Sequence, residues 1–370
     1  MSVFLPRADR CSVQLLLTSC PNDVIRDHHN ASTGALLPLI NPSPPPAGVG
    51  DRSVQAYNYR LCFTQNRSNW LPIPLPDPRN EYSRPETWEL LRRWVDARAA
   101  AGRPVALRDV LAIHPTVHGK NDVNDAGPIG TDLLGGSRRY ADGNWSVRAA
   151  VVDEHVQYTR GLLAFWKSDR SVPPGLRANV SSWGLCADEW PDTGGWPPQL
   201  YVRETRRMVG ALVLTQHDRM PQGGQRTKPD SIGLGSYGFD NHNHERIATG
   251  AWVYNEGNVN TDLAEYRKHP FELPYRSITP KASDVTNLLV TCCFSASHIA
   301  YGAVRLEPQL MMLGEAAGTA AAMTLARPRP VQQLDVAALQ VALRANREYP
   351  RYPAVLHESQ MVYDAASTHC

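Results

Sequence analysis

The sequence predicts a mixed α/β fold, with an α+β region ahead of a last strand and helix, and three patterns indicate it. Residues 53–64, SVQAYNYRLCFT, alternate apolar or aromatic side chains with polar ones, which is typical of a strand. Residues 85–102 and 149–168 repeat apolar side chains at helical spacing. An uninterrupted apolar run, residues 287–297, precedes an apolar helix that starts at Pro308, which predicts a buried strand followed by a helix.

The size and charge of the chain limit its class. At 370 residues it exceeds a typical single domain, so we expect two domains or one large domain with insertions. The hydrophobic fraction of 42% and the charged fraction of 20% are those of ordinary soluble globular proteins. Lys and Arg number 38 against 36 Asp and Glu, a net charge of +2 without a long run of one sign. Nucleic acid is therefore not an expected partner.

The first half of the chain begins irregularly and then forms a strand and a helix. NPSPPPAGVG, residues 41–50, excludes helix, so everything before about Asp51 is expected to be an irregular lead-in. The helix over residues 85–102 opens with Pro85 and ends before Gly102. Its apolar face consists of Trp88, Leu91, Trp94 and Val95.

The middle of the chain predicts a second helix and a basic helix face. Residues 149–168 place His155 among apolar residues, and VPPG at residues 172–175 ends the helix. A loop rich in Trp and Gly follows. Arg203, Arg206 and Arg207 then recur at helical spacing, which predicts a charged helix face.

The last strand and helix predict a ligand site. A helix that starts at Pro308, just after a buried strand, presents free backbone N–H groups that favour an oxygen-rich or anionic ligand. Small residues on one stripe, namely Gly314, Ala317, Gly318 and Ala321, allow close approach to a sheet or a cofactor. A membrane span is rejected, because the helix is slightly shorter than roughly 20 residues and contains Glu315.

At this point the residues resemble the FAD-dependent oxidoreductases. The motifs that carry the resemblance are QAYNYRLC (55–62), Lys120 with Asp122 and Asn124, LYVRETRRM (200–208), and residues 295–322, which occur in the order of that family. The resemblance implies FAD as cofactor and an incomplete two-dinucleotide-binding-type, glutathione-reductase-like flavoprotein fold. It is incomplete because no GxGxxG fingerprint occurs in the 370 residues. We therefore expect the carboxyl-terminal part of such an enzyme.

The resemblance also implies a division of the chain and a set of cofactor contacts. We expect a lead-in over residues 1–50, a substrate domain over 51–285, the final strand and helix of the FAD-binding domain over 286–326, and a C-terminal helix and tail over 327–370. The expected contacts to FAD are Ser297, Arg305, Glu307, Pro308 and Gly314. Arg305 could instead simply pair with Glu307.

His298 is the first candidate for a catalytic base, because it lies in the turn where the resemblance places the flavin ring. A structural histidine that anchors this turn is the alternative. Expected contacts to a polar, small-molecule or carbohydrate-like substrate are Lys120, Asp122, Asn124, Arg203, Arg207, Asp240, His242 and His244. The first three lie in a polar loop that could equally be a solvated turn.

Two other functions remain open at this stage. Asp240, His242 and His244 alternate, so on a strand they would share one face and could bind a metal for hydrolysis, although a polar substrate wall is preferred. The missing fingerprint would also suit a non-catalytic, vestigial binding module. No metal is assigned.

The cysteines and the amino terminus bear on the compartment. Seven Cys without CxxC pairs are expected to be thiols rather than a disulfide framework, with Cys292 and Cys293 buried as small hydrophobic side chains. The amino terminus only faintly resembles a secretory signal. Four Asn-x-Ser sequons, at Asn30, Asn66, Asn144 and Asn179, arise readily by chance and do not settle the compartment. The location stays open at this stage, with the cytoplasm slightly favoured.

Overall fold

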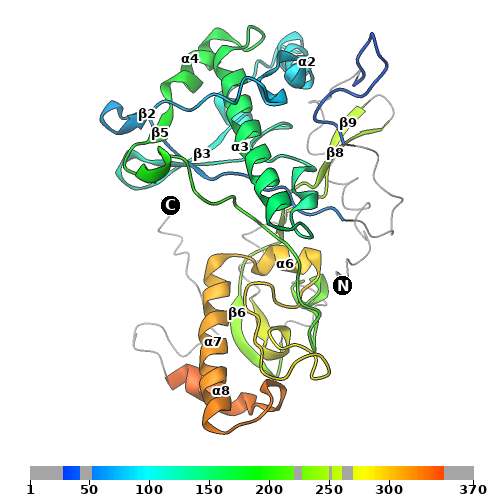
Figure 1. The fold of residues 1–370 in the computed structure, drawn as a ribbon, viewed down its shortest axis with the longest axis vertical. Coiled ribbons are helices and arrows are strands. Elements are labelled where there is room, and N and C mark those ends of the chain that lie inside the picture. The colour runs from blue at the N-terminus through cyan, green and yellow to red at the C-terminus, as the bar shows by residue number, and fades with distance from the viewer. Residues whose placement is uncertain (1–27, 42–51, 221–226, 250–251, 261–269, 346–370) are drawn as a thin grey trace. The chain divides into compact units, whose positions relative to one another are not determined.

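The computed structural model describes residues 28–41, 52–220, 227–249, 252–260 and 270–345. These residues form two compact units. Unit 1 comprises Glu204–His242 and the described residues from Val259 onward, and unit 2 comprises the described residues up to Arg203 together with Asn243–Asn258. Both units mix helix and strand, as the sequence predicts (Figure 1).

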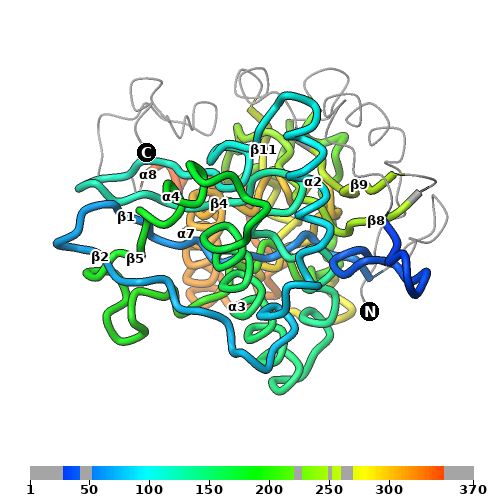
Figure 2. Tube along the Cα trace, turned by 90° about the horizontal axis from the view of Figure 1, so that it is seen from above, coloured from blue at the N-terminus to red at the C-terminus, as the bar shows by residue number. Residues whose placement is uncertain are grey.

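Unit 2 contains a five-stranded antiparallel sheet in the order β2-β5-β1-β4-β3, most of which can be followed in Figure 2. The strands are β1 (Leu61–Thr64), β2 (Trp70–Leu71), β3 (Ala112–Pro115), β4 (Asn121–Asn124) and β5 (Gly184–Cys186). Leu61 lies opposite Val123, and Phe63 lies opposite Leu185. All four are buried, so this face of the sheet lies on the core and the alternate residues form the other face. A separate hairpin joins β8 (Glu245–Thr249) to β9 (Trp252–Glu256).

The strand expected over residues 53–64 is shorter in the structure, because only its last four residues pair in a ladder. Residues 53–59 are buried but bond to scattered partners. Tyr57 N donates to Ser137 Oγ (2.9 Å), and Tyr201 N donates to Asn58 O (2.9 Å). Alternation of side chains therefore identified an extended, buried segment but not its pairing.

Three helices lie in the described part of unit 2, and two of them confirm predictions. After a 3-10 turn at Pro85–Trp88, α2 spans Glu89–Ala100. Helix α3 spans Trp145–Ser168 and starts earlier than residue 149, because Asn144 Oδ1 accepts from Val147 N (3.0 Å) and caps it. Helix α4 spans Pro174–Ser182.

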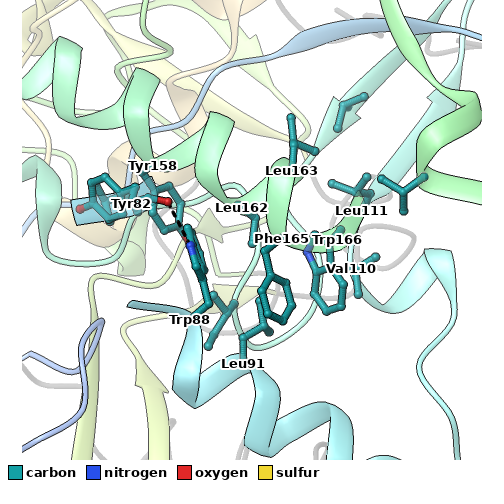
Figure 3. Packing of buried hydrophobic residues seen from close by; sticks show 14 of the residues in the cluster. Tyr82, Trp88, Leu91, Val110, Leu111, Tyr158, Leu162, Leu163, Phe165 and Trp166 are labelled. Carbon is teal, nitrogen blue, oxygen red and sulfur yellow. Dashed lines mark hydrogen bonds between the residues drawn. The ribbon is translucent and has the colours of Figure 1, made fainter. Parts of the chain in front are cut away.

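The core of unit 2 is rich in aromatic side chains from α3 and from the 3-10 turns that precede α2 (Figure 3). Trp88 donates from Nε1 to Tyr82 O (3.1 Å), and its ring centroid lies 5.7 Å from that of Tyr158 and 6.1 Å from that of Phe165. Gly161 permits this packing, because a Cβ there would lie 2.4 Å from Tyr82 O. The core thus fixes α3 beneath the loop that leads into α2.

The described residues of unit 1 form two short strand pairs and three helices. Strand β6 (Ser231–Gly235) pairs with β11 (Phe271–Pro274), and β7 (Asp240–Asn241) pairs with β10 (Val259–Asn260). The helices are α6 (His298–Val304), α7 (Glu307–Ala326) and α8 (Val336–Ala345). Helix α7 lies beside β6 and α8 (Figure 1). It starts one residue before Pro308 and so confirms the predicted helix.

Two predicted elements of the 201–297 region are wrong. Residues 287–293 are exposed or half-buried and form no strand, and only one parallel bridge, Leu214 to Ala296, occurs near the end of the run. The arginines predicted on a helix face lie in an irregular segment, residues 202–209. That segment instead bonds to residues 292–297, for example through Met208 N to Cys293 O (2.8 Å).

The expectation for the cysteines is also corrected. Cys62 and Cys186 form a disulfide between directly opposed positions of β1 and β5. Cys292 is exposed and Cys293 is half-buried, so the predicted burial of this pair is wrong as well. No spacing signal marked this disulfide, since its cysteines are 124 residues apart. Among the described residues, no helix has the length and apolar character needed to cross a membrane.

Candidate functional site

His298 and Glu204 form a dyad in unit 1. His298 is the first residue of α6, and Nδ1 lies 2.8 Å from Glu204 Oε2. The Glu204 side chain is only 1% exposed, and the same oxygen accepts from Arg207 NH1 (2.9 Å). A buried carboxylate requires such partners to offset its loss of solvation. The arrangement holds an imidazole in a fixed orientation beside a compensated negative charge.

The chain on either side of the dyad is fixed by backbone bonds. Ser297 caps α6 by accepting from Ala300 N (3.2 Å), and its own N–H donates to Leu214 O (2.7 Å). Arg207 donates from Nε to Ala296 O (3.0 Å), and its guanidinium lies 5.4 Å from the centroid of the Tyr301 ring. Glu204 and His298 are therefore positioned by two segments that each bond to the other.

Arg305 and Asp240 form a second polar contact in unit 1. Arg305 NH2 lies 3.0 Å from the backbone oxygen of Asp240 and 3.3 Å from its carboxylate. Asn241 donates from Nδ2 to His298 O (3.1 Å), so β7 is tied to the start of α6. Arg305 thus pairs with Asp240.

Asp240, His242 and His244 do not lie on one continuous strand, so the predicted shared face is absent from the structure. Strand β7 ends at Asn241, and His244 belongs to unit 2. His242 Nε2 lies 3.6 Å from Asp240 Oδ1. The guanidinium of Arg305 already pairs with the Asp240 carboxylate, and its positive charge opposes the binding of a metal cation there.

The first turn of α7 presents groups that a cofactor could use. Leu306 precedes the helix without a side-chain cap, Glu307 is exposed and Pro308 occupies the first turn. Gln309 is 5% exposed, and its Oε1 accepts no hydrogen bond within the described residues. Farther along, a Cβ added to Gly314 or Gly318 would meet no described atom within 4 Å. The exposed face of α7 is therefore open to close approach.

In unit 2, Asp122 and Asn124 lie on the polar face of the sheet rather than in the predicted loop, because β4 contains residues 121–124, and Lys120 directly precedes this strand. Lys120 Nζ lies 2.6 Å from Glu189 Oε1, and Asn124 Oδ1 accepts from Asn58 Nδ2 (3.1 Å). Asp122 pairs with Arg60. The distance from Arg60 Nε to Asp122 Oδ1 is 3.0 Å. Asp122 and Asn124 therefore share one face of the sheet, and Lys120 lies directly before β4.

The register extends this polar face across the sheet. Asp122 lies opposite both Cys62 and His114, and Cys186 lies opposite Trp70. Since Cys62 and Cys186 are also opposed, one row crosses all five strands. The guanidinium of Arg60 lies 5.5 Å from the ring of Tyr201 at the same face.

Arg203, predicted to contact substrate, is instead buried in unit 2. Its side chain is 0% exposed, NH1 lies 3.0 Å from Asp132 Oδ1, and it also donates to Ala56 O. Asp125 lies beside this pair, because its Oδ1 accepts from Asp132 N (3.0 Å). Burial, reinforced by the charge of Asp132, raises the pKa of Asp125 to about 8. Buried Arg246 nearby donates to Leu39 O (3.0 Å) and Pro128 O (2.7 Å).

Three features of these sites were missed by reasoning from the sequence. Glu204 lies inside the motif LYVRETRRM but was not singled out, although it is the partner of His298, 94 residues away. Arg60 lies inside a recognised motif but was not singled out. Gln309 follows Pro308 directly, and its place in the first helical turn was the one available signal.

A family model described as FAD dependent oxidoreductase matches residues 21–343. The match covers most of the chain, so the chain belongs to this family of flavoprotein oxidoreductases and its cofactor is FAD. The resemblance inferred from the motifs is thereby confirmed. No curated protein and no solved structure matches the chain.

Proposed function

We propose that the chain oxidises or reduces a polar organic substrate, with His298 as the group that moves the substrate proton. The observation that carries this proposal is the hydrogen bond of 2.8 Å between His298 Nδ1 and the buried Glu204 carboxylate. Donation from Nδ1 makes Nε2 the basic nitrogen of the neutral imidazole. Glu204 then stabilises the positive charge that forms when Nε2 takes up a proton.

FAD, when bound, accepts or supplies the hydride. We propose that Ser297, Arg305, Glu307, Pro308 and Gly314 contact it, together with Gln309. Two observations fit a cofactor at α7: the unsatisfied Gln309 Oε1, and the open space outside Gly314. A buried acceptor without a donor is costly, so a hydroxyl or N–H of the cofactor would stabilise it.

For the substrate we propose polar contacts from several of the predicted residues. In unit 2 these are Lys120, Asp122, Asn124 and His244, and in unit 1 they are Arg207, Asp240 and His242. The charges of Lys120 and Asp122 are already paired with Glu189 and Arg60, so this face favours a neutral, hydroxyl-rich molecule over an ion. Arg203 is buried, so we propose that it positions neighbouring segments through Asp132 and Ala56 O and does not contact the substrate.

We also propose that the two units derive from an incomplete glutathione-reductase-like flavoprotein fold. In this assignment residues 51–285 contain the substrate domain, and residues 286–326 contain the last segment of the FAD-binding domain. The family match and the long helix α7 support it.

The proposal is tested with the full chain, titrated with FAD and mixed anaerobically with a panel of aldoses and alditols. We expect a flavin spectrum and substrate-dependent bleaching. His298→Gln should lower the bleaching rate by about 10²- to 10⁴-fold, because a general base is lost, and leave FAD affinity unchanged. Glu204→Gln should give a smaller loss.

His217→Gln is the matched control, since His217 is an exposed histidine of the same unit and should change nothing. Unchanged bleaching by His298→Gln would refute the proposed base. Failure to take up FAD would favour the binding module, and stoichiometric bound zinc would favour the hydrolase.

A further inference from the structure

The four Asn-x-Ser sequons share a structural property that their sequence does not require. Asn30, Asn66, Asn144 and Asn179 are all exposed, and all lie in unit 2. Eleven other asparagines have described side chains, and Asn287 is the exposed one among them. The sequon asparagines are thus exposed, whereas most other asparagines with described side chains are not.

The side-chain amides of these residues are oriented in a consistent way. Each Oδ1 accepts a bond: from Ser32 N (2.9 Å) at Asn30, from Ser68 N (3.1 Å) at Asn66, from Val147 N (3.0 Å) at Asn144, and from Trp183 Nε1 (3.3 Å) at Asn179. No Nδ2 of the four donates a hydrogen bond within the described part of the chain. A substituent on Nδ2 would therefore break no contact, and the bond to Oδ1 would survive.

The disulfide in the same unit is an independent observation. Cys62 and Cys186 are joined across neighbouring strands, and Cys186 is buried. Disulfides of this structural kind form and persist in oxidising compartments, which are also where N-linked glycans are attached. The disulfide and the sequons therefore both indicate that unit 2 folds in an oxidising compartment.

We propose that the chain is N-glycosylated on unit 2, at Asn30, Asn66, Asn144 and Asn179, in an oxidising compartment. The donor is an oligosaccharide linked to a polyisoprenyl diphosphate. Nδ2 forms a bond to C1 of the first sugar, the bond from C1 to the diphosphate oxygen breaks, and Nδ2 loses one proton. No oxidation or reduction takes place.

The test uses the full-length protein isolated from the cells that make it naturally. Peptide N-glycosidase in heavy-oxygen water converts each glycosylated asparagine to labelled aspartate, which mass spectrometry locates. We expect label at the sequon asparagines and none at Asn287, the exposed asparagine outside a sequon. Unlabelled sequons, or label equal to that of Asn287, overturn the proposal.

Variants separate the glycan from other modifications. Ser68→Ala, Ser146→Ala and Ser181→Ala each remove one sequon and leave its asparagine in place. Each should increase electrophoretic mobility by one step when produced in the natural cells. Ser182→Ala, next to Ser181 but outside any sequon, should migrate as the wild type, and equal shifts for Ser181→Ala and Ser182→Ala would contradict the proposal.

Discussion

Asp125, which is half-buried, and His155, which is buried, are two groups of unit 2 that favour their uncharged forms. Burial, with the nearby Asp132 charge, raises the pKa of Asp125 from 3.8 to about 8. Burial lowers the pKa of His155 from 6.5 to about 4, even though Nδ1 bonds to Val151 O (2.7 Å). The two shifts act on stability in opposite directions.

The dependence of unfolding on pH follows from these shifts. Between pH 4 and 6.5 the folded state holds the Asp125 proton while the unfolded state holds the His155 proton, so the two slopes cancel. From pH 6.5 to about 8 only the Asp125 effect remains, and the free energy of unfolding of unit 2 should fall by up to about 2 kcal/mol.

Tryptophan fluorescence in urea measures this fall, because all nine tryptophans lie in unit 2. Asp125→Asn keeps the shape of the neutral acid and should remove the fall, whereas Asp142→Asn, at an exposed acidic residue of the same unit, should retain it. A decline that persists in Asp125→Asn would show that another group causes it.

Single residues were predicted from the sequence where a motif or a local position marked them. His298 was chosen from its place before the helix, and the structure gives it a carboxylate partner. Glu204 could not be found in this way, because no spacing rule relates residues 94 positions apart. Arg203 was predicted on a charged helix face from its spacing to Arg206 and Arg207, but the segment is not helical and Asp132 pairs with Arg203 in the interior.

Helix α7 has two faces that differ in what they contact. Leu313, Ala316 and Ala320 are fully buried, whereas Gly314 and Gly318 on the other side are exposed. Glycine within an exposed helical turn lowers stability relative to alanine, so its presence needs another reason. The proposed contact with FAD supplies one.

Gly314→Ala tests this reason. Without FAD the change should raise the free energy of unfolding of unit 1 by about 0.8–1 kcal/mol, because nothing clashes with the new methyl group. With FAD it should raise Kd at least about fivefold, the effect of about 1 kcal/mol of overpacking. Urea unfolding followed by circular dichroism and a flavin fluorescence titration measure the two effects.

Gly175→Ala is the matched control, since Gly175 lies in α4 of unit 2 and its added Cβ also meets nothing within 4 Å. It should stabilise its own unit and leave FAD affinity unchanged. A normal Kd in Gly314→Ala would mean that Gly314 does not contact the cofactor.

Helices were predicted better than strands, and the reason is physical. Helices α2, α3 and α7 are specified by local spacing, by Pro85 and Pro308 near their starts, and by the Asn144 cap. Strand pairing depends on segments far apart, so residues 53–60 and 287–297 were predicted as strands although their partners supply only isolated bonds. The apolar run at 287–293 lies partly at the surface, which its composition does not reveal.

At the scale of the whole molecule, the family and cofactor were predictable because several motifs occur in order along residues 55–322, within the matched span. The disulfide was not predictable, since the cysteines carry no characteristic spacing. It closes a span of 124 residues that includes α2, α3 and α4. A cross-link of this length restricts the unfolded chain strongly.

Replacing both Cys62 and Cys186 by Ser should therefore lower the free energy of unfolding of unit 2 by about 2–5 kcal/mol. Urea unfolding followed by tryptophan fluorescence measures the loss, and a reductant should reproduce it in the wild type. Cys292→Ser, at a free cysteine in unit 1, is the control and should leave unit 2 unchanged. Equal stability of the double variant and the wild type would refute the expected stabilisation.

The disulfide between β1 and β5 also determines the effect of a proteolytic cut in unit 2. A single cut in the exposed turn at residues 101–103, between α2 and β3, falls inside the covalent ring that Cys62 and Cys186 close. The two pieces would stay attached to one another and migrate as one molecule until the sulfurs were reduced. Damage to the backbone there would not by itself separate the strands that build the polar sheet face.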